Sequence, residues 1–323
     1  MGISVFASRS LLLFRQTIGL PLLCVVTVFA AVNLAENATA QTASKVEVKS
    51  ITLGLVSEVN RPAVEQNFRD LIAYVARKLS PGSSIDGKVV VAATAFELVK
   101  LLEQRRVDFY MESVYPTYTI NYVHGAGKTL LRRWKGGKPE YQSLIFTQRD
   151  GAVRRLEELR GKTIVFEDPG STSGFLMPKM FLQRSGFKLA EKREFDANAA
   201  PADIHYFFAA SQYRLLDAVL TKRAAAGAFS DDDHANLGDK EKAAISVLAQ
   251  TEKLPRHLLS VRADLAPATA SRVEEVLLAM QDDDEGRKIL SRTDQTTKFD
   301  RVPGGETALK RRLLDSFFSP DRK

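Results

Sequence analysis

The chain has 323 residues, enough for two domains or one large domain. Hydrophobic residues make up 45% and charged residues 26%, proportions that exclude wholesale disorder and collagen-like repetition. A net charge of +7 is mild for this length and does not by itself indicate nucleic-acid binding. The single cysteine, Cys24, excludes an intrachain disulfide and a zinc site with several cysteine ligands.

Residues 1–40 have the pattern of a secretory signal peptide. Arg9 and Arg15 precede an apolar stretch over 18–34, and Ala38-Thr-Ala40 supplies the small residues of a cleavage site. The sequence therefore predicts cleavage after Ala40 and a periplasmic mature chain, away from ATP and reduced nicotinamide. The alternative is an uncleaved membrane anchor, since the apolar stretch is close to the roughly 17–25 residues that span a bilayer.

The first part of the mature chain alternates strands and helices. The predicted strands cover 46–56, 88–93 and 107–111, and the predicted helices cover 62–79 and 96–106. This β-α-β-α-β order predicts a mostly parallel sheet with right-handed crossovers.

The alternation starts afresh near residue 145, which predicts a second α/β lobe. The predicted strands cover 140–148, 163–167, 227–230 and 246–249, and the helices 156–160, 173–185 and 209–222. Further helices are expected around 267–281 and 305–318. Because no flexible linker separates the lobes, we expect strands that cross between them. The first lobe would comprise 45–145 and 249–323, and the second lobe 146–248.

The most informative segment runs from Phe166 to Phe175 (FEDPGSTSGF), where a strand ends and a helix begins. Ser171, Thr172 and Ser173 are good N-cap residues, and the flanking glycines allow close backbone approach to a ligand. The first amides of a helix lack partners within it and point outward, which favours anion binding. Simple helix capping is the alternative, but one serine would suffice for that. Three hydroxyls therefore favour an oxyanion site.

Two enzyme motifs resemble this segment without matching it. A hydrolase nucleophile elbow needs serine at the centre of Gly170–Gly174, where Thr172 stands. A phosphate-binding P-loop needs a Gly-Lys-Ser/Thr that does not follow. The sequence also offers no nucleophile with a paired acid or base, so we predict no enzyme, no catalytic residue and no cofactor.

The sequence resembles the phosphonate, phosphite and phosphate-binding periplasmic component of ABC importers, the family of the alkylphosphonate-binding protein. The resemblance covers essentially the whole mature chain, and its specific element is the Ser-Thr-Ser-Gly segment. The matching segments are 167–174 (EDPGSTSG), 134–137 (WKGG), 140–143 (EYQS), 107–113 (VDFYMES), 255–262 (PRHLLSVR) and 298–300 (KFD).

The resemblance implies a type II periplasmic-binding-protein fold, with two α/β lobes, crossing strands and a ligand held between the lobes. It implies that the segment from Ser171 to Gly174 (Ser171, Thr172, Ser173 and Gly174) holds the phosphonate oxygens. The remaining implied ligand-binding residues are Glu112, Ser113, Tyr115, Glu58 and Asp231. Carboxylates near the pocket can meet a ligand amine in that family, a role open to Glu112, Glu58 and Asp231.

The chain departs from the family pattern at two places. Ala210-Ser-Gln212 replaces the Gly-Ser-His of many members, so a histidine contact is absent there. Glu112 places a carboxylate where a small neutral residue would suit a bare oxyanion. If Glu112 faces the ligand, like-charge repulsion disfavours free phosphate and favours a ligand with a cationic end. The alternative is that Glu112 pairs with a surface Lys or Arg.

Other polar clusters have simpler interpretations. Asp231-Asp-Asp-His234 is better explained as a solvated loop than as a metal site, because adjacent acids point in different directions. Arg132–Lys135 is too short a basic run to predict a nucleic-acid surface. Trp134 is expected to pack within a lobe, with a role at the edge of the ligand site as the alternative.

The predicted function is that of a secreted substrate-binding protein of an ABC importer, which binds a small phosphonate or related oxyanion. Its partner would be an ABC permease in the inner membrane. The alternative is a periplasmic sensor that presents its ligand to a membrane receptor.

Overall fold

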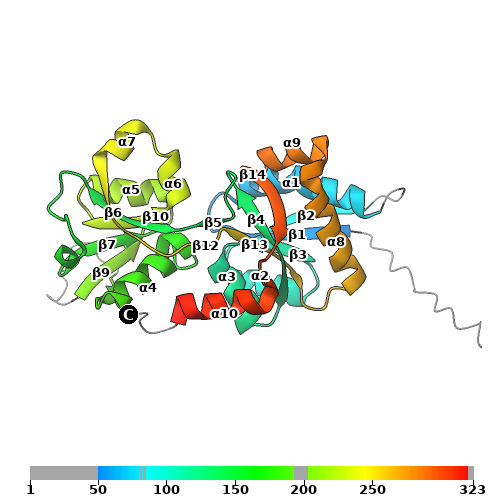
Figure 1. The fold of residues 1–323 in the computed structure, drawn as a ribbon, viewed down its shortest axis with the longest axis horizontal. Helices are drawn as coiled ribbons and strands as arrows, with labels where there is room; N and C mark the ends of the chain where they lie inside the picture. Colours follow the sequence, from blue (N-terminus) through cyan, green and yellow to red (C-terminus); the bar gives the residue numbers. More distant parts are fainter. Residues whose placement is uncertain (1–49, 81, 83–84, 193–202, 319–323) are drawn as a thin grey trace, which may run out of the picture. The chain divides into compact units, whose positions relative to one another are not determined.

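The computed structural model describes residues 50–80, 82, 85–192 and 203–318. Two six-stranded sheets, each flanked by helices, and one two-stranded sheet make up the fold (Figure 1). We call the sheet that contains β1, with its helices, the first lobe, and the sheet that contains β6, with its helices, the second lobe. The predicted pair of α/β lobes is thereby confirmed. The predicted signal peptide, residues 1–40, lies outside the described residues.

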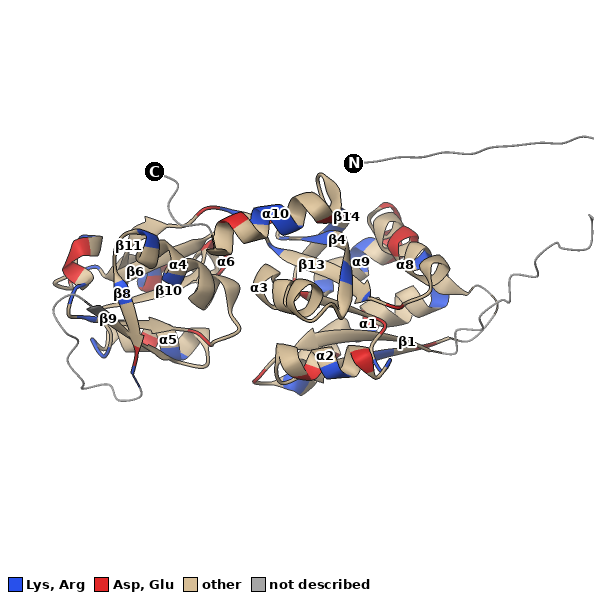
Figure 2. Ribbon diagram, turned by 90° about the horizontal axis from the view of Figure 1, so that it is seen from below, with Lys and Arg blue, Asp and Glu red and all other residues tan. Residues whose placement is uncertain are grey.

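The surface chemistry of the described residues is mixed. Lys and Arg as well as Asp and Glu are found on helices of both lobes in the view of Figure 2. None of the helices in the described ranges has the length and apolar character needed to cross a bilayer.

The sheet of the first lobe has the strand order β14-β4-β13-β3-β1-β2. In chain order its strands are β1 (Ser50–Val56), β2 (Asp86–Ala92), β3 (Phe109–Glu112), β4 (Gly127–Lys135), β13 (His257–Arg262) and β14 (Thr296–Arg301). β1 is parallel to β2 and β3, which confirms the predicted parallel arrangement. β13 and β14 run antiparallel to their neighbours, so the C-terminal part of the chain completes the sheet that the N-terminal part began.

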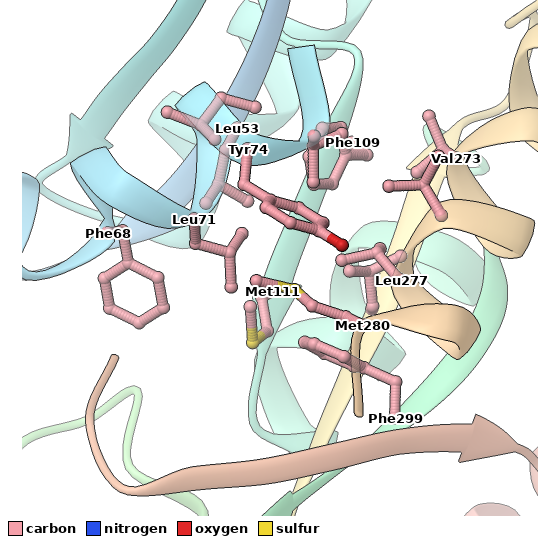
Figure 3. Packing of buried hydrophobic residues seen from close by; sticks show 14 of the residues in the cluster. Leu53, Phe68, Leu71, Tyr74, Phe109, Met111, Val273, Leu277, Met280 and Phe299 are labelled. Carbon is pink, nitrogen blue, oxygen red and sulfur yellow. The ribbon is translucent and has the colours of Figure 1, made fainter. Parts of the chain in front are cut away.

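Helices bury both faces of this first sheet. They are α1 (Arg61–Leu79), α2 (Ala95–Glu103), α3 (Val114–Tyr118), η1 (Thr119–Val123), α8 (Pro267–Ala279), η4 (Met280–Asp282), α9 (Asp284–Arg292) and α10 (Gly305–Phe318). Phe109 packs with Leu71 of α1 and Leu277 of α8 (Figure 3), whereas the next residue, Tyr110, packs with Leu98 of α2. This alternation is the period of two expected for a strand buried on both faces.

Helix α1 follows directly from its sequence. Pro62 lies in its first turn, where a missing amide costs no helical hydrogen bond. Phe68, Leu71 and Val75 fall on one face and are buried. The predicted helix over 62–79 is confirmed.

The sheet of the second lobe has the order β11-β6-β10-β7-β9-β8. Its strands are β6 (Ser143–Gln148), β7 (Thr163–Phe166), β8 (Lys188–Glu191), β9 (Asp203–Phe208), β10 (Ala226–Ser230) and β11 (Ile245–Gln250). Its helices are η2 (Leu156–Leu159), η3 (Thr172–Leu176), α4 (Met177–Arg184), α5 (Gln212–Leu220), α6 (Asp231–Asn236) and α7 (Asp239–Ala244). β7 is parallel to β9 and β10, so its carboxyl end lies at an edge of the sheet where ligands commonly bind.

Two short strands connect the lobes. β5 (Glu140–Tyr141) carries the chain from β4 to β6, and β12 (Leu254–Pro255) carries it back from β11 to β13. They pair with each other antiparallel, with Tyr141 opposite Leu254. The predicted strand over 140–148 is thus two strands in different sheets. The sheets show which strands belong to each lobe. The exact lobe limits of 45–145, 146–248 and 249–323 stay a prediction.

Helix α10 contacts both lobes. Leu309, Leu313 and Phe317 share a hydrophobic cluster with Val114 of the first lobe and Met177 of the second. The C-terminal end of α10 therefore packs where the lobes meet.

Candidate functional site

The predicted oxyanion segment lies at the carboxyl end of β7 and opens a helix, as expected. η3 is a single wide turn, in which the Leu176 amide donates to the Ser171 carbonyl at 3.0 Å. Pro178 explains the irregularity, because it has no amide for the carbonyl of Gly174. The Glu167 amide donates to that carbonyl instead, at 3.1 Å. This hydrogen bond therefore connects the turn before η3 to the start of the helix.

Ser171 caps this helix. Its Oγ accepts from the Gly174 amide and donates to Glu167 Oε2, both at 2.9 Å. A Cβ on Gly174 would come within 2.7 Å of Glu167 Oε2 and 2.8 Å of Ser171 Oγ, so the position needs glycine. The capping alternative thus describes Ser171 in this structure, while the other two hydroxyls have different partners.

Thr172 joins the two lobes. Its Oγ1 accepts from the Tyr115 amide at 3.0 Å and donates to Ser113 Oγ at 2.9 Å. The Thr172 side chain is buried, with 1% of the residue exposed. Three of the predicted site residues, far apart in the sequence, are therefore in direct contact.

Ser173 lies against the crossing strand. Its carbonyl accepts from Ser143 Oγ at 2.6 Å, and Ser143 begins β6 directly after the crossing strand. Burial raises the pKa of Tyr141. Sequence analysis named neither Tyr141 nor Ser143 as a site residue, although they are two apart in a predicted strand and so lie on one face.

Glu112 stands at the end of β3 next to these contacts. Its Oε1 accepts from the Val56 amide at 2.6 Å. Burial raises the pKa of this carboxyl to about 8, with main-chain hydrogen bonds from Val56 and Ser113 opposing the shift. The partner of Glu112 in this hydrogen bond is a main-chain amide of β1, not the surface Lys or Arg of the predicted alternative.

Further carboxyls surround the turn. Burial, with the charge of Asp168 next in effect, raises the pKa of Glu167 to about 7. Burial also raises the pKa of Asp168, and the charge of Glu58 from the first lobe adds to the shift. Glu58 itself is exposed. The segment from Ser171 to Gly174 therefore lies in acidic surroundings contributed by both lobes.

Asp231 begins α6 and faces the crossing segment. Its Oδ1 accepts from the Gln142 amide at 3.3 Å, and its own amide donates to the Gln142 carbonyl at 3.0 Å. These hydrogen bonds join Asp231 to Gln142 rather than to the Ser171–Gly174 segment. Its role toward a ligand stays a prediction.

The next two acids of α6 also have partners. Asp232 Oδ2 lies 2.6 Å from Nε of Arg256, a buried guanidinium, and Asp233 caps its own helix through Ser230. No group of three or more metal-ligating side chains occurs among the residues that the structure describes.

Trp134 packs within the first lobe. The ammonium of Lys298 lies 4.0 Å from its ring centroid, and Arg132 lies 5.7 Å away. Arg132 is itself bound by both oxygens of Asp300, at 3.0 and 2.7 Å. The basic run 132–135 is therefore part of the fold rather than a free cationic patch.

A separate pocket of about 580 Å³ lies between α4, α10 and the chain before β12. Met177, Phe181 and Leu254 supply apolar lining, and Arg184 and Arg312 are among its charged residues. These arginines are held by the protein, since Arg184 donates to the Ser316 carbonyl and Arg312 to Glu140, both at 2.5 Å. None of the predicted ligand-binding residues lines this pocket.

Known proteins resemble the chain along most of its length. The family described as "ABC transporter, phosphonate, periplasmic substrate-binding protein" matches residues 53–303. The phosphate-import protein PhnD of Mycolicibacterium smegmatis is 29% identical over 160 residues, which are 48% of this chain and 48% of that protein. The match thus spans about half the length of that curated relative.

Solved structures show the same fold. XAC2383 from Xanthomonas citri bound to chloride ion has a TM-score of 0.76 and 26% identity, covering 83% of this chain and 96% of that one. The same protein bound to ATP has a TM-score of 0.75 and 24% identity, covering 83% and 95%. PhnD1 from Prochlorococcus marinus in complex with methylphosphonate has a TM-score of 0.63 and 13% identity, covering 83% and 97%.

These matches agree with the resemblance, the type II periplasmic-binding fold and the absence of an enzyme function that the sequence predicts. The chain belongs to the family of phosphonate-binding periplasmic substrate-binding proteins of ABC transporters, whose members are binding proteins rather than enzymes.

Proposed function

We propose that this protein binds a small phosphonate or related oxyanion between its two lobes and delivers it to an ABC permease in the inner membrane. The observation that carries the proposal is the contact of Thr172 with Ser113 and Tyr115. It joins hydroxyl and amide groups from the two lobes at one point. Such groups donate hydrogen bonds to an oxyanion, and charge-assisted bonds of this kind are strong.

The start of η3 supports the same site. The first main-chain amides of a helix and the hydroxyls of Thr172 and Ser173 would supply donors without a lysine or arginine. The curated relative is named a phosphate-import protein, and one structural neighbour holds methylphosphonate. We carry both ligand classes over to this chain as candidates.

The acidic surroundings favour a particular ligand class. Glu112 and Glu58 come from the first lobe, and Glu167 and Asp168 from the second. Above about pH 8, where Glu112 and Glu167 are ionised, a dianion would be repelled, whereas a cationic group on the ligand would offset their charge. We therefore expect an aminoalkylphosphonate to bind more tightly than methylphosphonate or phosphate.

Isothermal titration calorimetry of the mature chain, residues 41–323, tests this with 2-aminoethylphosphonate, methylphosphonate, phosphite and phosphate. We expect the amine-bearing phosphonate to bind most tightly. A Thr172→Ala variant should bind it about tenfold or more weakly, because a buried hydroxyl that contacts both lobes is lost. The matched control is Thr221→Ala, whose hydroxyl donates to the Asp217 carbonyl and accepts from Arg223.

Two results would count against the proposal. Absence of heat with all four compounds, even at millimolar concentration, would contradict the oxyanion site. Equal weakening by the Thr172 and Thr221 variants would show that the contact between the lobes is not part of it.

A further inference from the structure

The last turn of α10 is held by an arginine of the second lobe. Arg184, the final residue of α4, donates from Nη2 to the Ser316 carbonyl at 2.5 Å and to the Asp315 carbonyl at 3.2 Å. The last four carbonyls of a helix have no donor within it and carry the negative end of its dipole. The guanidinium therefore caps a helix that follows β14, a strand of the first lobe.

The capped turn packs close to both helix starts of the proposed ligand site. Phe317 is buried, and its ring centroid lies 6.2 Å from that of Tyr115 in an edge-to-face contact. Phe317 also shares a hydrophobic cluster with Met177, which directly follows η3. Tyr115 is the residue whose amide donates to Thr172. The residue after the capped carbonyls is thus one packing step from the contact that joins the two lobes.

A second arginine ties α10 to the segments that cross between the lobes. Arg312, one turn before the capped end, donates to Glu140 Oε1 of β5 at 2.5 Å and to the Lys253 carbonyl next to β12 at 2.6 Å. The pocket of about 580 Å³ is lined by residues of both α4 and α10, including Arg184. The two helices are therefore joined at Arg184 and separated by open space next to it.

We propose that α10 is a strap between the lobes, latched by Arg184, and that this latch holds the two halves of the ligand site in register. The inference rests on the proposed function. Arg184 is a positioning residue, because it acts through Phe317 and Tyr115 and would not touch the ligand itself. A ligand that needs both lobes binds only the molecules whose lobes are in register, so its apparent affinity falls in proportion to their fraction. The latch therefore changes the affinity for every ligand by one common factor.

Calorimetry on the mature chain tests this with 2-aminoethylphosphonate, methylphosphonate and phosphate. Arg184→Met keeps a long apolar side chain and removes every donor. It should weaken binding of all three compounds by the same factor, about 3- to 10-fold, the usual effect of a hydrogen bond to a partly exposed charged group. Arg184→Lys should bind within about twofold of the wild type, because an ammonium can also cap helix carbonyls.

Arg223→Met is the matched control. Arg223 also belongs to the second lobe, but its guanidinium binds Asp217 and Thr221 at the end of α5. This variant should leave every affinity unchanged. Wild-type affinities in Arg184→Met would overturn the inference. Unequal factors for the three compounds would also overturn it, because they would place this residue at the ligand itself. Failure of the wild type to bind any of the three would instead contradict the proposed function.

Small-angle X-ray scattering gives a second measurement that needs no ligand. Without the latch the lobes should separate more often, so unliganded Arg184→Met should have a larger radius of gyration than the wild type, whereas Arg223→Met should match it. Thermal melts show that each variant is folded at the measuring temperature. If Arg184→Met does not fold, Arg184→Gln, which keeps an amide donor without the charge, takes its place in both measurements. A radius equal to that of the wild type would contradict the strap, whether or not a ligand is known.

Discussion

The junction after β1 and the junction after β7 both lead from a parallel strand into a helix, one in each lobe. The first passes through Ser57–Asn60 and enters α1 with no side-chain cap. The second passes through Glu167–Ser171 and enters η3 with a serine cap followed by two buried hydroxyl residues. The same topological position is thus an exposed turn in one lobe, whereas in the other lobe the turn leads directly into two buried hydroxyl residues.

The difference indicates what the proposed oxyanion site has beyond a helix start at the end of a strand. At the first junction the Ser57 hydroxyl donates to the nearby Val59 carbonyl, and the residues are exposed. At the second junction Thr172 reaches the other lobe. Contact with the opposite lobe, which excludes water from the donors, is what distinguishes the two.

Removing hydroxyls from the second junction should have the largest effect. Ser171→Ala with Ser173→Ala should weaken phosphonate binding by a few kcal/mol, because several charge-assisted hydrogen bonds are lost together. Ser57→Ala at the first junction should leave the affinity unchanged. Calorimetry on both variants makes the comparison, and equal affinities for the two would contradict a special role of the second junction.

The pH dependence of stability should distinguish the buried carboxyl of Glu112 from the exposed acids of the first lobe. Its pKa rises from an ordinary value of 4.5 to about 8, so the folded protein binds an extra proton between these values. The associated stability is fully present below about pH 4.5 and is lost as the pH rises through about 8. Stability should therefore fall with rising pH across this window.

Glu112→Gln should remove this part of the pH dependence. Its melting temperature should exceed that of the wild type by a few degrees at pH 9, and the gap should narrow toward pH 5. Glu65→Gln, which changes an exposed i,i+4 ion pair with Arg69, should give a profile parallel to that of the wild type. A Glu112 profile that also runs parallel would show that burial does not hold this carboxyl protonated.

Much of the fold follows from local patterns in the sequence. The parallel strands and the helices between them have apolar spacings that depend only on neighbouring residues. The segment 166–175 was identifiable because glycines and hydroxyl residues follow a β-run directly. Even Pro178, an irregularity in the sequence, corresponds to the wide turn of η3.

The parts that sequence analysis missed depend on distant partners. β4 contains two consecutive arginines, and their burial depends on residues far along the chain: Arg133 is 1% exposed and is held by Asp294 and Thr296. Strand 140–148 has an unbroken β pattern, so nothing local marks the change of sheet near Gln142. The contact of Thr172 with Ser113 joins residues 59 positions apart, and no spacing rule predicts it.

The smallest expected effect lies at the first junction, in its backbone. Asn60 precedes α1 with φ of 56°, a left-handed conformation that asparagine tolerates and most residues do not. Asn60→Ala should lower the free energy of unfolding by about 1 kcal/mol, whereas Asn60→Gly should change it by less, because glycine adopts this conformation freely. Urea denaturation measures both variants. Neither should alter phosphonate affinity, since this junction is proposed to hold no ligand donor; a loss of affinity in Asn60→Ala would mean that the two junctions share the ligand more equally than their contacts indicate.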